Sequence, residues 1–144
     1  MNSNNPSVTI FYSIEEAIKS YRKLSQREIK KVIPDITVDQ ALILQMINDK
    51  QLSQTEMADL IFKDYASMTR IIGLMIKKDY LVKTTSDNDR RVSVLKITPR
   101  GKSTLKQLIP IIKQNRETAL EGLEIEELNK LKGSLSKIIQ NCKK

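Results

Sequence analysis

Apolar side chains recur every three or four residues over much of the chain, which is the spacing of one face of an α-helix. In the first such stretch, residues 8–31, the recurring positions are Ile10, Ile14, Ala17, Ile18, Tyr21 and Leu24. Pro34 follows this stretch and cannot continue a helix. We therefore predict a long first helix that ends before Pro34, preceded by a short tail over residues 1–7.

Three shorter helices are predicted next, and each begins at a residue that can cap a helix N-terminus. Thr37 and Gln40 have the spacing of a capping box, in which two side chains satisfy free backbone N–H groups at the helix start. Ser53 and Glu56 repeat that spacing. Asp64 can cap the third helix. The apolar stripe of this third helix comprises Met68, Ile72 and Met75.

Alternating, β-branched segments replace the helical pattern over residues 81–86 and 92–98. The polar run Asp87-Asn88-Asp89-Arg90-Arg91 lies between them. Alternation on both sides of a polar turn is typical of two paired strands. The sequence therefore predicts a β-hairpin with a charged tip.

Two further helices are predicted after the hairpin. Thr98 is a favourable N-cap, and Pro99 occupies the first helical position, where proline is preferred. Pro110 can kink this helix, and Gly122 ends it. Its apolar positions are Leu105, Ile109, Ile112, Ala119 and Leu123. The last helix begins near Glu124 and carries a stripe typical of coiled coils. The stripe consists of Ile125, Leu128, Leu131, Leu135, Ile138 and Cys142.

The order of these elements favours one fold. Two short capped helices in succession suit a helix-turn-helix, and a hairpin directly after them suits a wing. The fold class we predict is mainly α with a small β-hairpin: a winged helix-turn-helix flanked by long N- and C-terminal helices. In such a fold the second of the two helices enters the major groove of DNA.

The charge distribution agrees with a nucleic-acid partner. The chain carries 25 Lys and Arg against 17 Asp and Glu, which gives a net charge of +8. Residues 63–102 alone have a net charge of +6 and contain the third helix and the hairpin. A basic stretch of this kind favours a polyanion, although by charge alone it also fits a solvated basic face.

Small, hydroxyl and basic residues gather at the start of the third helix: Tyr65, Ala66, Ser67, Thr69 and Arg70. Small side chains permit a close approach to the groove wall, and Arg70 can reach a guanine or a phosphate. At the hairpin tip, Arg90 and Arg91 are suited to the narrow, negative minor groove. Asp89 can hold an arginine in one rotamer. The alternatives are an ordinary amphipathic helix and a solvated turn with local ion pairs.

The segment from Ser67 to Gly101 resembles the MarR family of transcriptional regulators. The resemblance lies in the runs Ser-Met-Thr-Arg-Ile-Ile, Met-Ile-Lys-Lys-Asp-Tyr-Leu-Val, Asp-Asn-Asp-Arg-Arg and Val-Leu-Lys-Ile-Thr-Pro-Arg-Gly. The family's wing has Asp-x-Arg or Asp-Arg-Arg, followed by a strand that ends in Leu-Thr-x-x-Gly. The order of the helices extends the resemblance over nearly the whole chain.

This resemblance implies a homodimer that binds a palindromic operator in double-stranded DNA. Residues 8–33 and 99–142 would form the dimer interface and residues 37–98 would bind DNA, within a single domain of residues 1–144. It makes Arg91 the minor-groove arginine, with Asp89 as its partner. The full set of expected DNA contacts is Ser53, Thr55, Tyr65, Ala66, Ser67, Thr69, Arg70, Asp89, Arg90 and Arg91.

The resemblance further implies a repressor that is released by a small effector, for which an aromatic or phenolic compound is expected by analogy. The family's thiol-based sensors of oxidants carry a reactive Cys near the N-terminus. The one Cys of this chain is Cys142, so sensing of that type is not expected. Asp79 fills a position where many members have Gly, so the turn there is expected to differ in detail.

Other classes of protein fit the composition less well. The chain has no His, so a His-based catalytic triad or metal cluster is excluded, and we expect neither an enzyme nor a cofactor. No apolar run approaches the roughly 20 residues of a membrane helix, and the polar N-terminus does not read as a signal peptide, so we expect a cytoplasmic protein. The alternative function is a winged-helix module or anti-repressor that contacts protein instead of DNA.

Overall fold

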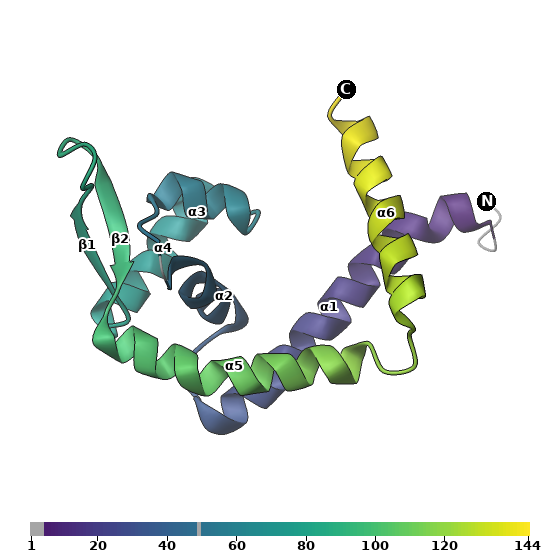
Figure 1. Ribbon diagram of the computed structural model, residues 1–144, viewed down its shortest axis with the longest axis horizontal. Coiled ribbons are helices and arrows are strands. Elements are labelled where there is room, and N and C mark those ends of the chain that lie inside the picture. Colours follow the sequence, from purple (N-terminus) through teal and green to yellow (C-terminus); the bar gives the residue numbers. More distant parts are fainter. Residues whose placement is uncertain (1–4, 49) are drawn as a thin grey trace.

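The computed structural model describes residues 5–48 and 50–144, and over these ranges it contains six helices and one two-stranded antiparallel sheet (Figure 1). In chain order the elements are α1 (Pro6–Val32), α2 (Val38–Ile47), α3 (Gln54–Leu60), α4 (Tyr65–Lys77), β1 (Leu81–Thr85), β2 (Ser93–Ile97), α5 (Pro99–Ala119) and α6 (Ile125–Cys142). The predicted order of helices and hairpin is confirmed, and so is the mainly α fold class.

Each of four predicted N-cap side chains accepts a hydrogen bond from the backbone N–H three residues later. The pairs are Thr37 with Gln40, Ser53 with Glu56, Asp64 with Ser67, and Thr98 with Gly101. Both predicted capping boxes are complete, because Gln40 and Glu56 also accept the N-cap backbone N–H. These local bonds fix where α2, α3, α4 and α5 begin.

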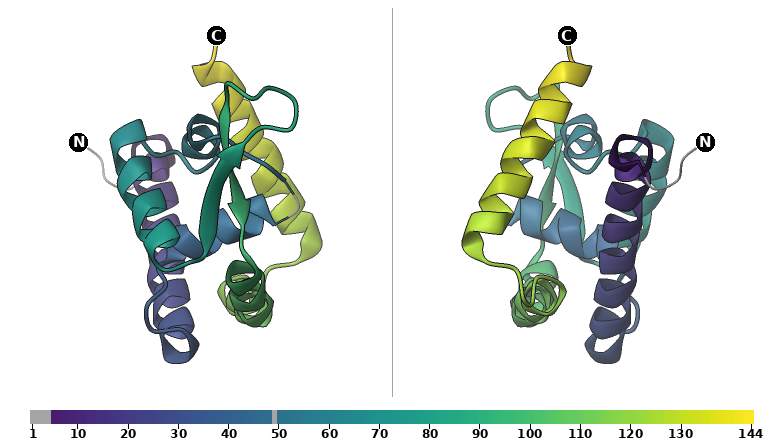
Figure 2. Two further views of the ribbon diagram at one scale, coloured as in Figure 1. Left: turned by 90° about the vertical axis from the view of Figure 1, so that its left-hand side faces the viewer. Right: turned by 90° about the vertical axis from the view of Figure 1, so that its right-hand side faces the viewer.

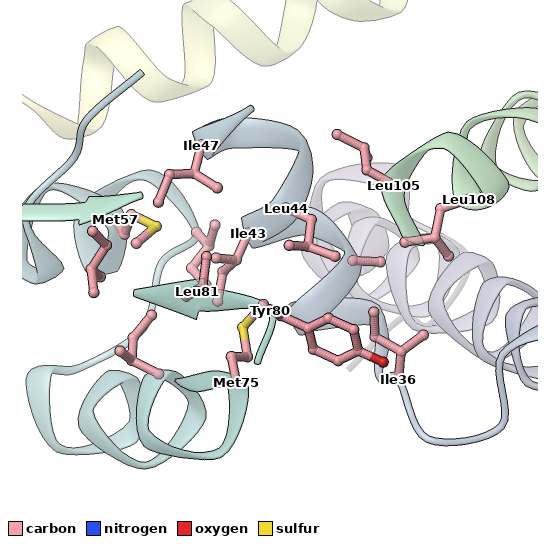
Figure 3. Close-up of a cluster of buried hydrophobic side chains, with 14 of the residues drawn as sticks. Ile36, Ile43, Leu44, Ile47, Met57, Met75, Tyr80, Leu81, Leu105 and Leu108 are labelled. Atoms are coloured by element: carbon pink, nitrogen blue, oxygen red, sulfur yellow. The ribbon is translucent and has the colours of Figure 1, made fainter. Parts of the chain in front are cut away.

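The core of the winged region forms where α2 lies between α4, the sheet and the start of α5. Figure 3 shows side chains from all four meeting there, including Leu44 of α2, Met75 of α4, Leu81 of β1 and Leu105 of α5. Each of these four side chains is at most 4% exposed. The packing fixes the outward face of α4, because Met68, Ile72 and Met75 are all buried on its inner side.

The sheet has one feature that the sequence pattern does not predict. Its strands pair from Leu81 opposite Ile97 to Thr85 opposite Ser93. Leu52, which precedes α3, also pairs with Leu95 through a backbone bond of 2.8 Å from the Leu95 N–H to the Leu52 carbonyl oxygen. The wing is therefore attached to the segment that leads into α3.

The junction between α4, the sheet and α5 depends on close backbone packing. Asp79 follows α4 with a left-handed φ of 65°, so an aspartate here adopts the conformation that favours glycine. Its carbonyl oxygen accepts a bond of 2.6 Å from the Thr98 hydroxyl. Gly101 lies against the backbone of Tyr80, where a Cβ would collide with the Tyr80 carbonyl oxygen.

Two regions of the chain leave apolar faces uncovered. α6 and the N-terminal half of α1 extend away from the winged region and cross in the view of Figure 1, but the turned views of Figure 2 show that they lie apart. No residue of α6 is buried, and in α1 only Ser25 and Ile29 are. On α5, Leu105 and Ile112 of the predicted apolar stripe are buried, Ile109 is 54% exposed, and its neighbour Leu108, outside the predicted stripe, is fully buried. The helix continues through Pro110.

Candidate nucleic-acid interface

The N-terminal part of α4 presents most of its predicted contact residues to solvent. Tyr65, Ala66, Thr69 and Arg70 are exposed, and Ser67 is half-buried. Their exposure follows from the apolar stripe on the opposite side of the helix, which packs into the core. The helix start therefore offers a tyrosine, small side chains and an arginine on one outward face.

The cap of α4 is formed by Asp64. Its carboxylate accepts bonds from the Ser67 backbone N–H at 2.8 Å and from the Ser67 hydroxyl at 3.0 Å. The backbone bond, reinforced by the hydroxyl bond, lowers the pKa of Asp64 below its ordinary value. Ser67 therefore donates its hydroxyl proton within the protein, which leaves the oxygen lone pairs for an outside donor.

Thr69 makes two hydrogen bonds on the outer face of α4. Its hydroxyl donates to the Tyr65 carbonyl oxygen at 3.0 Å and accepts from the Gln54 side-chain amide at 2.7 Å. Gln54 is the first residue of α3, so this bond joins the two helices of the helix-turn-helix. Sequence reasoning missed Gln54, because a bond across 15 residues leaves no local pattern.

The wing tip holds Arg91 in a forked contact with Asp89. The Arg91 Nε and Nη2 atoms each donate at 3.1 Å to one carboxylate oxygen of Asp89, and the Arg91 backbone N–H donates at 3.0 Å. These bonds, the side-chain pair first, lower the pKa of Asp89. The Arg91 side chain is 89% exposed, and Arg90 is exposed beside it. A pair this exposed adds little to stability, but it orders the arginine.

A second contact ties the wing to the body of the protein. The Gln51 side-chain amide donates to the Asp87 carboxylate at 2.5 Å. Asp87, which the sequence places beside the arginines, is therefore bonded to the segment before α3. Together with the pairing of Leu52 and Leu95, this bond holds the wing at two points along its length.

A cleft of about 140 Å³ separates the wing from the two helices. It is lined by Ser53, Gln54, Thr55, Tyr65, Lys83, Ser93, Val94 and Leu95. Ser53 and Thr55, both expected to contact DNA, therefore lie between the wing and α4, although the Ser53 hydroxyl already accepts the Glu56 backbone N–H. Lys83 of β1 is a further exposed cation at the cleft that the sequence analysis did not single out.

Neither a cluster of metal ligands nor a membrane-spanning helix occurs in residues 5–48 and 50–144. In this part of the chain no three His, Cys, Asp or Glu side chains come together as metal ligands. No helix in the same residues has the length and apolar character to cross a membrane.

Comparison with known proteins finds similar sequences in one family of regulators. A model described as the MarR family matches residues 35–92, which span α2 to the wing tip. The HTH-type transcriptional regulator SarZ of Staphylococcus aureus (strain MRSA252) is 28% identical over 139 residues, covering 94% of this chain and 90% of SarZ.

Solved structures share the fold over almost the whole chain. A mutant of MarR from E. coli, complexed with operator DNA, superimposes with a TM-score of 0.82 at 18% identity, covering 96% of this chain and 99% of that one. BpsR of Bordetella bronchiseptica, whose DNA binding is regulated by 6-hydroxynicotinic acid, gives 0.80 at 19% identity, covering 96% and 95%. These likenesses extend beyond the winged region to the long terminal helices.

Proposed function

Because this chain is a DNA-binding transcriptional regulator of the MarR family, with that family's winged helix-turn-helix, we propose that it acts as a homodimer that represses transcription from a palindromic operator. The observation that carries this proposal is the cleft between the wing and the helix-turn-helix, which is lined by Tyr65 of α4 and by Lys83 of β1. Arg70 lies further along α4 and Arg91 at the tip of the wing, so each of the two elements carries an exposed arginine. Such an arrangement suits simultaneous contact with the major groove and the adjacent minor groove.

Each part of the interface has a distinct role in this proposal. Tyr65, Ala66, Ser67, Thr69 and Arg70 enter the major groove, where base edges carry the sequence information. Arg91 enters the minor groove, and its hydrogen bonds to Asp89 orient its side chain. Arg90 contacts the phosphate backbone beside it. Ser53 and Thr55 at the start of α3 contact phosphates, which set the register without reading bases.

The proposed dimer interface consists of residues 8–33 and 99–142, with the uncovered apolar faces of α1 and α6 at its centre. Phe11 is 58% exposed on α1, and Ile125 and Leu131 are 75% and 53% exposed on α6. Large exposed apolar side chains that recur along a helix favour an interface, since a protein that left such surface in water would be prone to aggregate. A symmetric dimer presents two winged regions and therefore binds a palindrome.

A small aromatic acid is the effector that we propose. A cavity of about 350 Å³ lies between α2 and α5, with the apolar side chains of Leu105, Ile109 and Ile112 beside Lys113 and Arg116. An aromatic ring can pack on the apolar wall while a carboxylate pairs with the cations. The regulation of BpsR by 6-hydroxynicotinic acid supports this class of compound by analogy.

Selection of bound fragments from random-sequence DNA tests the central part of the proposal. The full chain should enrich a two-fold symmetric sequence with half-sites about one helical turn, roughly 10 base pairs, apart. Adding benzoate or nicotinate should weaken binding to that sequence, and Arg116→Ala should remove the effect. Failure to enrich any sequence, or enrichment of a single unsymmetric site, would contradict the proposal.

A further inference from the structure

Two glutamines that lie three positions apart, Gln51 and Gln54, bond to different parts of the interface. Gln51 donates to Asp87 in the wing, and Gln54 donates to Thr69 in α4. The first bond acts on the position of the wing. The second acts on Thr69, which is exposed on the helix that we propose enters the major groove, so this bond bears on base recognition.

The hydroxyl of Thr69 is largely used within the protein. A threonine hydroxyl has one proton and two lone pairs. The proton goes to the Tyr65 carbonyl oxygen, and one lone pair accepts the Gln54 amide. Thr69 therefore has no proton left to donate to a base, while its side chain remains exposed. What it offers the groove is chiefly its methyl group, which suits the C5-methyl group of thymine.

The side-chain amide of Gln54 keeps one donor and one acceptor free. It has two N–H donors and a carbonyl oxygen, and among the described residues its one side-chain bond uses a single N–H, toward Thr69. The remaining N–H and oxygen match N7 and the N6 amino group of adenine, which glutamine contacts through two bonds. Gln54 lines the cleft beside Tyr65 and Lys83, so this edge lies at the interface rather than in the core.

We infer that Gln54 is a specificity-determining residue of the DNA interface and that, together with Thr69, it selects A·T base pairs within each half-site. Gln54 bonds to the adenine edge, and the Thr69 methyl group, held in place by the Gln54 bond, packs against thymine. The inference rests on the proposed recognition of DNA by α4. It adds a base-contacting residue of α3 to those of α4. It also states which base pairs Gln54 and Thr69 select together, namely A·T.

The test compares base preferences of the full chain and three variants by selection from random-sequence DNA. Gln54→Ala should lose the preference for adenine at one symmetric pair of positions, a change of about 5- to 150-fold per half-site. Thr69→Ser keeps the hydroxyl and its bond to Gln54 but lacks the methyl group. It should keep the adenine preference and lose the thymine preference.

Gln51→Ala is the matched control, because it removes a neighbouring glutamine that bonds to the wing. It should weaken binding without changing base preference at the Gln54 positions. The inference is overturned if Gln54→Ala selects the parent's sequence, or binds all sequences more weakly by one common factor, as a merely structural bond would. It is also overturned if Thr69→Ser keeps every preference. A parent chain that selects no sequence at all would instead overturn the proposed function, and the inference with it.

Discussion

Phe62 lies in the turn between α3 and α4 in a backbone conformation that large side chains avoid. Its φ is 60°, and its side chain is 92% exposed. A left-handed conformation costs an L-residue about 1–2 kcal/mol, and so exposed a side chain recovers little of this through packing. The turn of the helix-turn-helix is therefore strained at a single residue.

Replacing Phe62 by glycine should relieve that strain. After allowing for the greater freedom of glycine in the unfolded chain, we expect Phe62→Gly to raise the free energy of unfolding by about 0.5–1 kcal/mol. Phe62→Ala keeps the strained conformation and should bring no such gain. Urea unfolding of both variants measures the difference, and equal stabilities would show that the turn is not strained by its side chain.

Arg91 is the residue whose removal should affect DNA binding most selectively. Because its side chain is 89% exposed, Arg91→Ala should leave the fold intact. The plot of log affinity against log salt concentration should become shallower by about one ion per arginine, hence about two per dimer. Titration of labelled DNA at several salt concentrations measures this slope. An unchanged affinity at physiological salt would exclude Arg91 from the interface.

Asp89→Ala should give a partial form of the Arg91→Ala defect, because it frees the arginine without removing it. The pH dependence follows from the lowered pKa of Asp89. A lowered carboxyl pKa keeps Asp89 charged, and the pair intact, until the pH falls through that lowered value. The bond between Asp89 and Arg91 should therefore persist when the pH is lowered to about 4, where an ordinary aspartate begins to be protonated.

Among the elements, helix starts are predictable from sequence because their determinants are local. Thr37 and Ser53 find their partners three residues away, so spacing alone predicts the bonds. Contacts between distant segments leave no such spacing. The pairing of Leu52 with Leu95 and the bond from Gln54 to Thr69 both depend on how the helices pack, and neither could be predicted.

The apolar stripe of α5 shows a second limit of sequence patterns. The predicted stripe includes Ile109 and leaves out Leu108, and only the packing of α5 against its neighbours decides that Leu108 is buried. Periodicity predicts that a helix has an apolar face, but residues at the edge of that face are assigned by tertiary contacts. The exposed residue then remains available for the cavity beside Arg116.

Gly101 tests the packing at the start of α5. A Cβ at this position would meet the Tyr80 carbonyl oxygen and lie 2.7 Å from Cγ1 of Ile97. Gly101→Ala should therefore lower the free energy of unfolding by about 1–3 kcal/mol, as overpacking usually does. Gly73→Ala is the control, because nothing lies within 4 Å of its Cβ position.

In the control, alanine's better helix propensity should raise stability by about 0.5–1 kcal/mol. Chemical unfolding in the absence of DNA compares the two variants directly. If Gly101→Ala were as stable as Gly73→Ala, the start of α5 would not lie as close to the Tyr80 backbone as the structure shows.

At the scale of the whole molecule, the terminal helices carry apolar faces that nothing covers within the described part of one chain. The apolar stripe of α6 lies in solvent, and Leu131 in its middle is 53% exposed. A charge placed there should prevent association, since an interface core does not tolerate an unpaired charge. We expect Leu131→Glu to dissociate the proposed dimer.

Asn129→Glu provides the control for Leu131→Glu. It makes the same change in charge two residues away, outside the stripe, and should leave the dimer intact. Size-exclusion chromatography with light scattering measures both masses. Two dimeric variants would exclude the α6 stripe as the interface, and two monomeric variants would point to charge rather than position.

The most direct test of the central claim is the mass of the protein, free and bound to DNA, by analytical ultracentrifugation. The duplex should carry the selected sequence with both half-sites. We predict twice the chain mass of 16.5 kDa for the free protein at micromolar concentration, and two chains on each duplex. A free monomer that binds the duplex tightly as a single chain would contradict the account.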